Sequence, residues 1–130
     1  MSSEISELAL MKLKTLEILS LNLEPGNKIS IEFLVYDKNS DYGTEEIIQF
    51  YQIVKNRLEL EALRWFGSVV SFHAEQHANY PCEEASAARE RSGPATEVRI
   101  KLSNGSRIEV VAREFSHNVK TILRRPPRGK

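Results

Sequence analysis

The chain has 130 residues, 41% of them hydrophobic, with 18 basic and 18 acidic side chains. This size and composition fit one ordinary globular domain, and a chain of this length can bury enough surface to fold without disulfide bonds or a structural metal. The single cysteine excludes an internal disulfide, and no apolar run approaches the ~18 residues of a membrane span. The acidic start, MSSEISELAL, lacks the basic flank and apolar core of a signal peptide, so we expect a soluble cytoplasmic protein.

The charge is unevenly divided along the chain. Residues 1–97 carry 9 basic and 16 acidic side chains, a net charge of −7, whereas residues 98–130 carry 9 basic and 2 acidic ones, a net charge of +7. Such asymmetry is typical of a protein with a polyanionic partner, or of one whose own halves attract each other. Both interpretations stay open.

The N-terminal part predicts a short helix over residues 3–12 and then a β-hairpin. Apolar and polar residues alternate over residues 19–23 and again over 29–35, which is the period of half-buried strands. Between them, the stretch EPGNK supplies a proline for the first central turn position. Gly26 or Asn27 can take the positive φ that the turn requires.

The longest predicted helix runs from Thr44 to Gly67. Thr44 suits the N-cap, and Gly67 suits the left-handed residue that ends a helix. The apolar residues of its main face fall at spacings of four, three, four and seven: Ile47, Tyr51, Val54, Leu58 and Trp65. Other apolar residues lie off this face, which predicts a second contact surface for self-association. The residues assigned to that surface are Ile53, Leu60 and Leu63.

A strand is predicted over residues 68–75, with Val70 and Phe72 on one face. The small and charged residues that follow cannot bury enough surface to offset the entropy of ordering them, so we expect a mobile loop at about residues 76–96. This loop leads into a second hairpin.

The second hairpin carries an Asn-Gly dipeptide, which is typical of a two-residue turn. That turn would place apolar and polar side chains on the same face of the hairpin. A three-residue loop of residues 103–105 instead pairs Ile100 with Ile108 and keeps one face apolar. We therefore predict the longer loop, with Gly105 at positive φ. Beyond it, Ser116 is expected to cap a short helix that Pro126 stops.

The expected element order is ββαβββα. We predict an α+β domain over residues 1–125, in which two hairpins and one strand form an antiparallel sheet, the long helix packs on one face and a short helix ends the domain. Residues 126–130 are expected to form a basic flexible tail.

The stretch HAEQHANYPC holds two of the three histidines, His73 and His77, and the only cysteine, Cys82. The zincin motif needs a glutamate directly after the first histidine, but Glu75 is two residues on. A structural zinc site usually takes two close pairs of ligands, and His117 would be a remote fourth. The sequence therefore predicts no metal and no cofactor at these residues.

No catalytic motif is complete. Cys82 precedes Glu83 and Glu84, which disfavour a reactive thiolate, and the glycines are isolated rather than grouped in a phosphate-binding loop. We expect a protein that is not an enzyme.

The second hairpin carries the most informative charge. In the expected register Lys101 lies opposite Arg107, and like charges directly opposed across two strands are destabilising. A negative partner would relieve this, either the protein's own acidic half, in the same or another copy, or an external polyanion. The residues predicted to meet the anionic partner are Arg99, Lys101, Arg107, Arg113, Arg124 and Arg125.

These observations predict a small non-catalytic protein-binding or assembly module that self-associates. The alternative is a nucleic-acid-binding protein that uses the second hairpin and the C-terminal tail, although this face lacks aromatic residues for base stacking. A metal-dependent enzyme centred on His73 and His77 is the third hypothesis. No membrane partner is expected.

Overall fold

The computed structural model describes residues 8, 11, 14–36, 41–60, 68–80 and 93–124. These residues form one six-stranded antiparallel sheet with the strand order β1-β2-β3-β6-β5-β4. The strands are β1 (Thr15–Glu24), β2 (Lys28–Tyr36), β3 (Tyr42–Glu59), β4 (Val69–Tyr80), β5 (Gly93–Leu102) and β6 (Arg107–Arg124). Within these described ranges no helix is long and apolar enough to cross a membrane.

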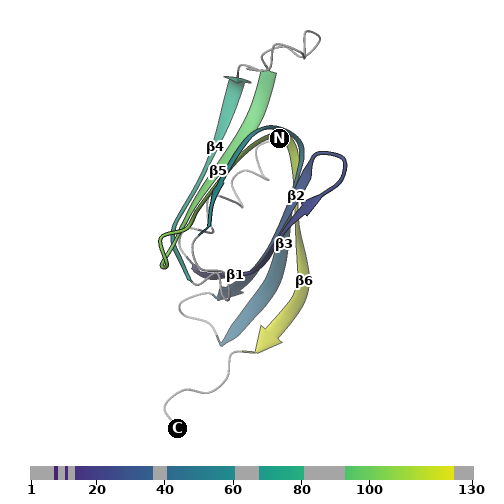
Figure 1. The fold of residues 1–130 in the computed structure, drawn as a ribbon. Helices are drawn as coiled ribbons and strands as arrows, with labels where there is room; N and C mark the ends of the chain where they lie inside the picture. Colours follow the sequence, from purple (N-terminus) through teal and green to yellow (C-terminus); the bar gives the residue numbers. More distant parts are fainter. Residues whose placement is uncertain are drawn as a thin grey trace.

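The sheet consists of two meanders with the same connectivity. Strands β1, β2 and β3 pair in chain order, as do β4, β5 and β6, and the two meanders join where β3 pairs with β6. The sheet curls until its outer strands approach each other, and a bridge links Glu17 of β1 to Ser68, just before β4. Figure 1 shows the strands surrounding a common interior.

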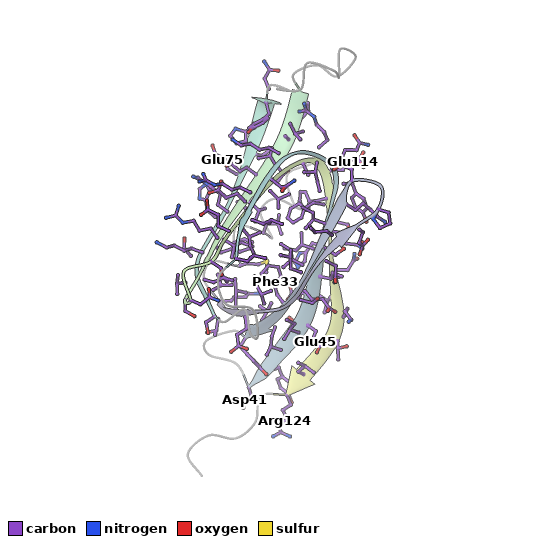
Figure 2. All side chains as sticks on the ribbon, in the orientation of Figure 1. Phe33, Asp41, Glu45, Glu75, Glu114 and Arg124 are labelled. Atoms are coloured by element: carbon purple, nitrogen blue, oxygen red, sulfur yellow. The ribbon has the colours of Figure 1, made fainter. Side chains whose placement is uncertain are left out.

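Apolar side chains from all six strands fill this interior. Phe33 of β2 points into it (Figure 2) and meets Phe72 of β4 edge to face, with ring centroids 6.1 Å apart. Leu8 and Met11, which precede the sheet, are buried in the same core. The other buried members are Leu16, Ile18, Ile29, Ile31, Val35, Ile48, Phe50, Val98, Ile100, Leu102, Ile108, Val110 and Ala112.

The α+β prediction is wrong, because residues 42–59 form β3 and not the first part of a long helix. Ile48 and Phe50 face the core with the alternation of a strand, and the segment is rich in the β-branched and aromatic residues that strands favour. Gln52 then takes a φ of 52°, and the register with β6 shifts between Ile53 and Lys55. Such bulges move apolar side chains out of strict alternation, so their spacing resembles that of a helix.

The short C-terminal helix is also absent, because β6 continues to Arg124. Val119 pairs with Glu46 of β3, and the register shifts again before the next pair, Thr121 with Glu45. Val119 and Ile122 are 55% and 73% exposed. Their helical spacing therefore again reflects a bulged strand.

Both predicted hairpins are confirmed. In the first turn Gly26 and Asn27 take positive φ values of 83° and 61°. In the second hairpin Ile100 pairs with Ile108, as the apolar face predicted, and Gly105 has a φ of 95°. Local turn chemistry was sufficient at both places, but face alternation was sufficient only in the second hairpin, because Leu19 and Leu23 of the first are 42% and 67% exposed.

The strand predicted over residues 68–75 corresponds to β4, but one of its side chains is turned the other way. Phe72 is buried as predicted, whereas Val70 is 60% exposed. The register of β4 against β5 shifts between Val69 and Ser71, so the intervening residue does not share the face of Phe72.

Some predicted features lie outside the described residues. The loop expected at 76–96 is strand at both ends, since β4 ends at Tyr80 and β5 begins at Gly93, and the residues between them are not described. The helix over residues 3–12, apart from its two buried members, and the tail at 126–130 are not described either.

Gly43 generates a test of the packing between β2 and β3. It lies opposite Tyr36, and a Cβ on Gly43 would sit 2.3 Å from the Tyr36 ring and 2.7 Å from the carbonyl oxygen of Val35. Gly43→Ala is therefore expected to lower the free energy of unfolding by about 1–3 kcal/mol, measured by urea denaturation. The control Thr121→Val, at an exposed position of β6, should change it by less than about 0.5 kcal/mol. Equal stability of Gly43→Ala and the wild type would contradict this packing.

Candidate functional site

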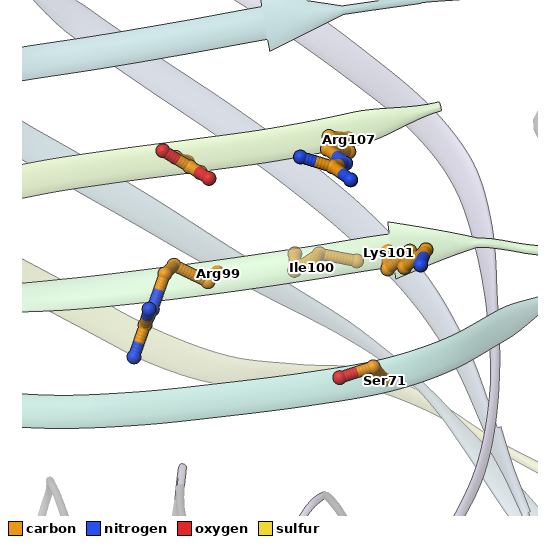
Figure 3. Close-up of a pocket in the computed structure, with 6 residues that line it drawn as sticks. Ser71, Arg99, Ile100, Lys101 and Arg107 are labelled. Carbon is orange, nitrogen blue, oxygen red and sulfur yellow. The ribbon is translucent and has the colours of Figure 1, made fainter. Parts of the chain in front are cut away.

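The outer face of β4, β5 and β6 carries the charged residues of interest. Successive side chains of a strand point to opposite faces, so the residues between the buried positions of β5 and β6 point outward. They line a pocket that is open to solvent (Figure 3). We call it the basic pocket; its lining residues are Ser71, Arg99, Ile100, Lys101, Arg107 and Glu109.

Two cations of the basic pocket have no ion-pair partner in the part of the chain that the structure describes. Lys101 of β5 lies directly opposite Arg107 of β6, in the register that the sequence predicted. Glu59 of β3 lies opposite Arg107 on the other side, but its carboxylate pairs with Arg57, at 2.7 Å. The expected balancing of Lys101 and Arg107 by the protein's own acidic half is therefore not found among the described residues.

The other arginines assigned to the anionic partner lie elsewhere. The guanidinium of Arg113 donates hydrogen bonds to the backbone carbonyls of Gly93, at 2.8 Å, and Pro94, at 3.2 Å, which fixes the start of β5. Arg124 is at the opposite end of β6 from Arg107, and Arg125 is outside the described residues. The structure thus brings together only part of the predicted set.

The residues assigned to self-association do not share a surface. Ile53 packs against the core, Leu60 is 36% exposed just after β3, and Leu63 lies outside the described residues. The strip that they were expected to form depended on the long helix. Self-association remains a prediction without a surface to support it.

A second cluster lies on the same outer face, around the histidines of β4. Glu75 and Glu97 are directly opposite in the β4–β5 pairing. His77 Nε2 is 2.8 Å from Glu97 Oε1, and His73 Nε2 is 3.3 Å from Glu75 Oε1. One ligand atom from each of Glu75, His77 and Glu97 lies within 4.8 Å of the others, so this trio could hold a metal ion.

Sequence reasoning missed Glu97 as a member of this cluster. It considered Cys82, which lies outside the described residues, and His117, which points into the interior. The signal that could have found Glu97 is the pairing of β4 with the second hairpin, which places it opposite Glu75.

His117 belongs to a buried pair inside the sheet. Its Nε2 is 2.5 Å from Oε1 of Glu46, which is 6% exposed, and the hydroxyl of Thr44 donates to the same carboxylate. Burial acts to raise the pKa of Glu46, but hydrogen bonds from His117 and Thr44, with the charges of His117 and Lys14, outweigh it and lower that pKa. The carboxylate is thereby held ionised between β3 and β6.

The lowered pKa of Glu46 predicts a pH dependence of stability. Because the carboxyl is more acidic in the folded state than its ordinary value of 4.5, its contribution is fully present above that pH. The contribution is lost as the pH falls through the folded-state pKa. Glu46→Gln should therefore be less stable than the wild type at pH 7, and the difference in free energy of unfolding should shrink on acidification.

Urea denaturation across a pH series measures this difference. The control Glu114→Gln, at an exposed position of β6 (Figure 2), should follow the wild-type curve. Wild-type and Glu46→Gln curves that run parallel down to acid pH would contradict the assignment.

Comparison with known proteins adds no relative to this geometry. A scan against protein-family models, a search of curated proteins and a search of solved structures each found no match.

Proposed function

We propose that this protein is a non-catalytic protein-binding module whose basic pocket takes an acidic segment of a partner protein. The observation that carries this proposal is the unrelieved pair of cations, Lys101 opposite Arg107, on the outer face of the sheet. Like charges directly opposed across two strands destabilise the fold, so a negatively charged group is needed to offset the repulsion between the two cations.

A carboxylate of the partner supplies the missing charge. The guanidinium of Arg107 offers a planar fork of donors for a carboxylate, and the ammonium of Lys101 adds a mobile second charge. Arg99 lines the same pocket but already approaches two carboxylates, with its Nε 3.7 Å from Glu97 Oε2 and its Nη2 4.0 Å from Glu75 Oε1. Lys101 and Arg107 are therefore the main anion-binding residues.

Several features favour an acidic protein segment over nucleic acid. Glu109 lines the pocket itself, and its carboxylate would repel a continuous phosphate backbone. None of the described residues that line the pocket is aromatic, so these residues offer no platform for stacked bases. A few carboxylates spaced along a peptide fit a short basic pocket better than a uniformly charged strand does.

The neighbouring strand edge fits an extended partner. β4 is an outer strand that pairs with β5 on one side, and Ser71 of β4 lines the basic pocket. On its other side, the described part of the chain shows only the bridge from Glu17 to Ser68. A peptide in extended conformation can add to such an edge through backbone hydrogen bonds.

Binding is tested with a labelled glutamate-rich peptide and a labelled single-stranded oligonucleotide, by fluorescence anisotropy at increasing salt. The wild type should bind the peptide, more weakly as salt rises. The double variant Lys101→Ser/Arg107→Ser should lose that binding, and the control Arg124→Ser, on the same strand but far from the pocket, should keep it. No peptide binding, or binding of the oligonucleotide alone that the double variant loses, would overturn the proposal.

A stability measurement separates a binding role from a folding role. Lys101→Glu replaces a like-charge pair by an opposite-charge pair with Arg107, so it should raise the free energy of unfolding by about 0.2–1 kcal/mol while weakening peptide binding. The neutral variant Lys101→Gln should lie between the two. A fall in stability on Lys101→Glu would show that Lys101 serves the fold.

A further inference from the structure

We propose that Glu75, His77 and Glu97 form a Zn²⁺-binding site on the outer face of β4 and β5, apart from the basic pocket. This trio differs from the set weighed in the sequence, because its third member comes from β5 and neither Cys82 nor His117 takes part. Both carboxylates and the imidazole are ordinary zinc ligands.

The geometry needs only small side-chain movements. Glu75 and Glu97 are opposite one another, and His77 is the next outward residue of β4 after Glu75. The three ligand atoms lie within 4.8 Å of one another. Zn–N and Zn–O bonds of about 2.0–2.1 Å place tetrahedral ligands about 3.4 Å apart. Side-chain rotations can make that adjustment while the strand pairing stays as it is.

The electrostatics favour a cation at this point. Two carboxylates directly opposed across β4 and β5 repel each other, and among the described residues only the guanidinium of Arg99, at 3.7–4.0 Å, and the imidazoles of His73 and His77 lie within ion-pair distance of them. A divalent ion bound directly to both carboxylates neutralises them more completely than a guanidinium at that distance. Arg99 is thus a competitor of the metal.

The ligands are also partly ordered before a metal arrives. The side chains of His77 and Glu97 are only 28% and 20% exposed and are already hydrogen-bonded to each other. The ring of Tyr80 packs edge to face on the His77 ring, with centroids 5.2 Å apart. Binding therefore costs less side-chain entropy than at a fully mobile surface cluster.

The donor set selects the class of metal. An imidazole nitrogen suits Zn²⁺ and its transition-metal neighbours, whereas Mg²⁺ and Ca²⁺ prefer shells made of oxygen alone. Three protein ligands leave a position for water or another small ligand. Zn²⁺ should therefore bind with Mg²⁺ and Ca²⁺ present in excess.

Calorimetric titration of the full chain with zinc chloride tests the site. The wild type should bind one equivalent, and His77→Gln and Glu97→Gln should each weaken binding by about tenfold or more, at least the loss seen for residues that only support metal ligands. The control Glu114→Gln, which removes an exposed carboxylate of β6 outside the trio, should stay near the wild-type affinity. Circular dichroism should show the same fold in every variant, because these side chains lie on the outer face.

Two further measurements fix the assignment. Arg99→Gln should tighten zinc binding, since it removes the competing cation, whereas an accidental loss of structure would weaken it. Co²⁺ substituted for zinc should show no thiolate charge-transfer absorption. Absence of zinc binding in the wild type would overturn the proposal. Zinc affinity that His77→Gln and Glu97→Gln leave unchanged would also overturn it. The same holds if Arg99→Gln leaves zinc binding unchanged or weakens it, or if a thiolate absorption band implicates Cys82.

Discussion

The pairing of β3 with β6 is the constraint on which the rest of this structure depends. Each meander alone has one apolar face and a third strand with one unpaired edge, and only the pairing of β3 with β6 makes them one sheet. Both strands are 18 residues long, and register shifts between Glu45 and Glu46 and between Ile53 and Lys55 let them bend around the core. The buried Glu46–His117 pair joins the same two strands from the inner side.

This closure divides the molecule into an inside that specifies the fold and an outside that is available for chemistry. On the outer face of the second meander, Arg99 approaches Glu75 and Glu97 and also lines the basic pocket. The carboxylate–histidine cluster and the basic pocket therefore compete for one guanidinium. An ion that neutralises the carboxylates leaves Arg99 available to an anionic partner, so the two proposed ligands should favour each other's binding.

The sequence was informative where structure is decided locally. The turn at residues 25–27 and the loop at 103–105 follow from residues that tolerate positive φ, and the loop also follows from the need to keep apolar side chains on one face of its hairpin. Both are observed. The long strand β3 was misread because its bulges disturb the period of two, and sequence spacing cannot distinguish a bulged apolar strand from a helix. The opposition of Lys101 and Arg107 followed from the correct hairpin register. The meeting of His77 with Glu97 did not, because it depends on a pairing between strands separated by a long connection.

The order of the strands also has a consequence for how the chain reaches this structure. The pairing of β3 with β6 joins Tyr42 to Arg124, 82 residues further along the chain, so β6 is the last strand of this sheet to be synthesised. The first meander can form early, but the inner face that includes Phe33 and Phe50 then waits for β6 to complete the enclosure. Pairings between residues so distant along the chain slow folding and leave apolar surface and a strand edge exposed in the meantime. The first meander, produced by itself, should therefore be a species that chaperones bind.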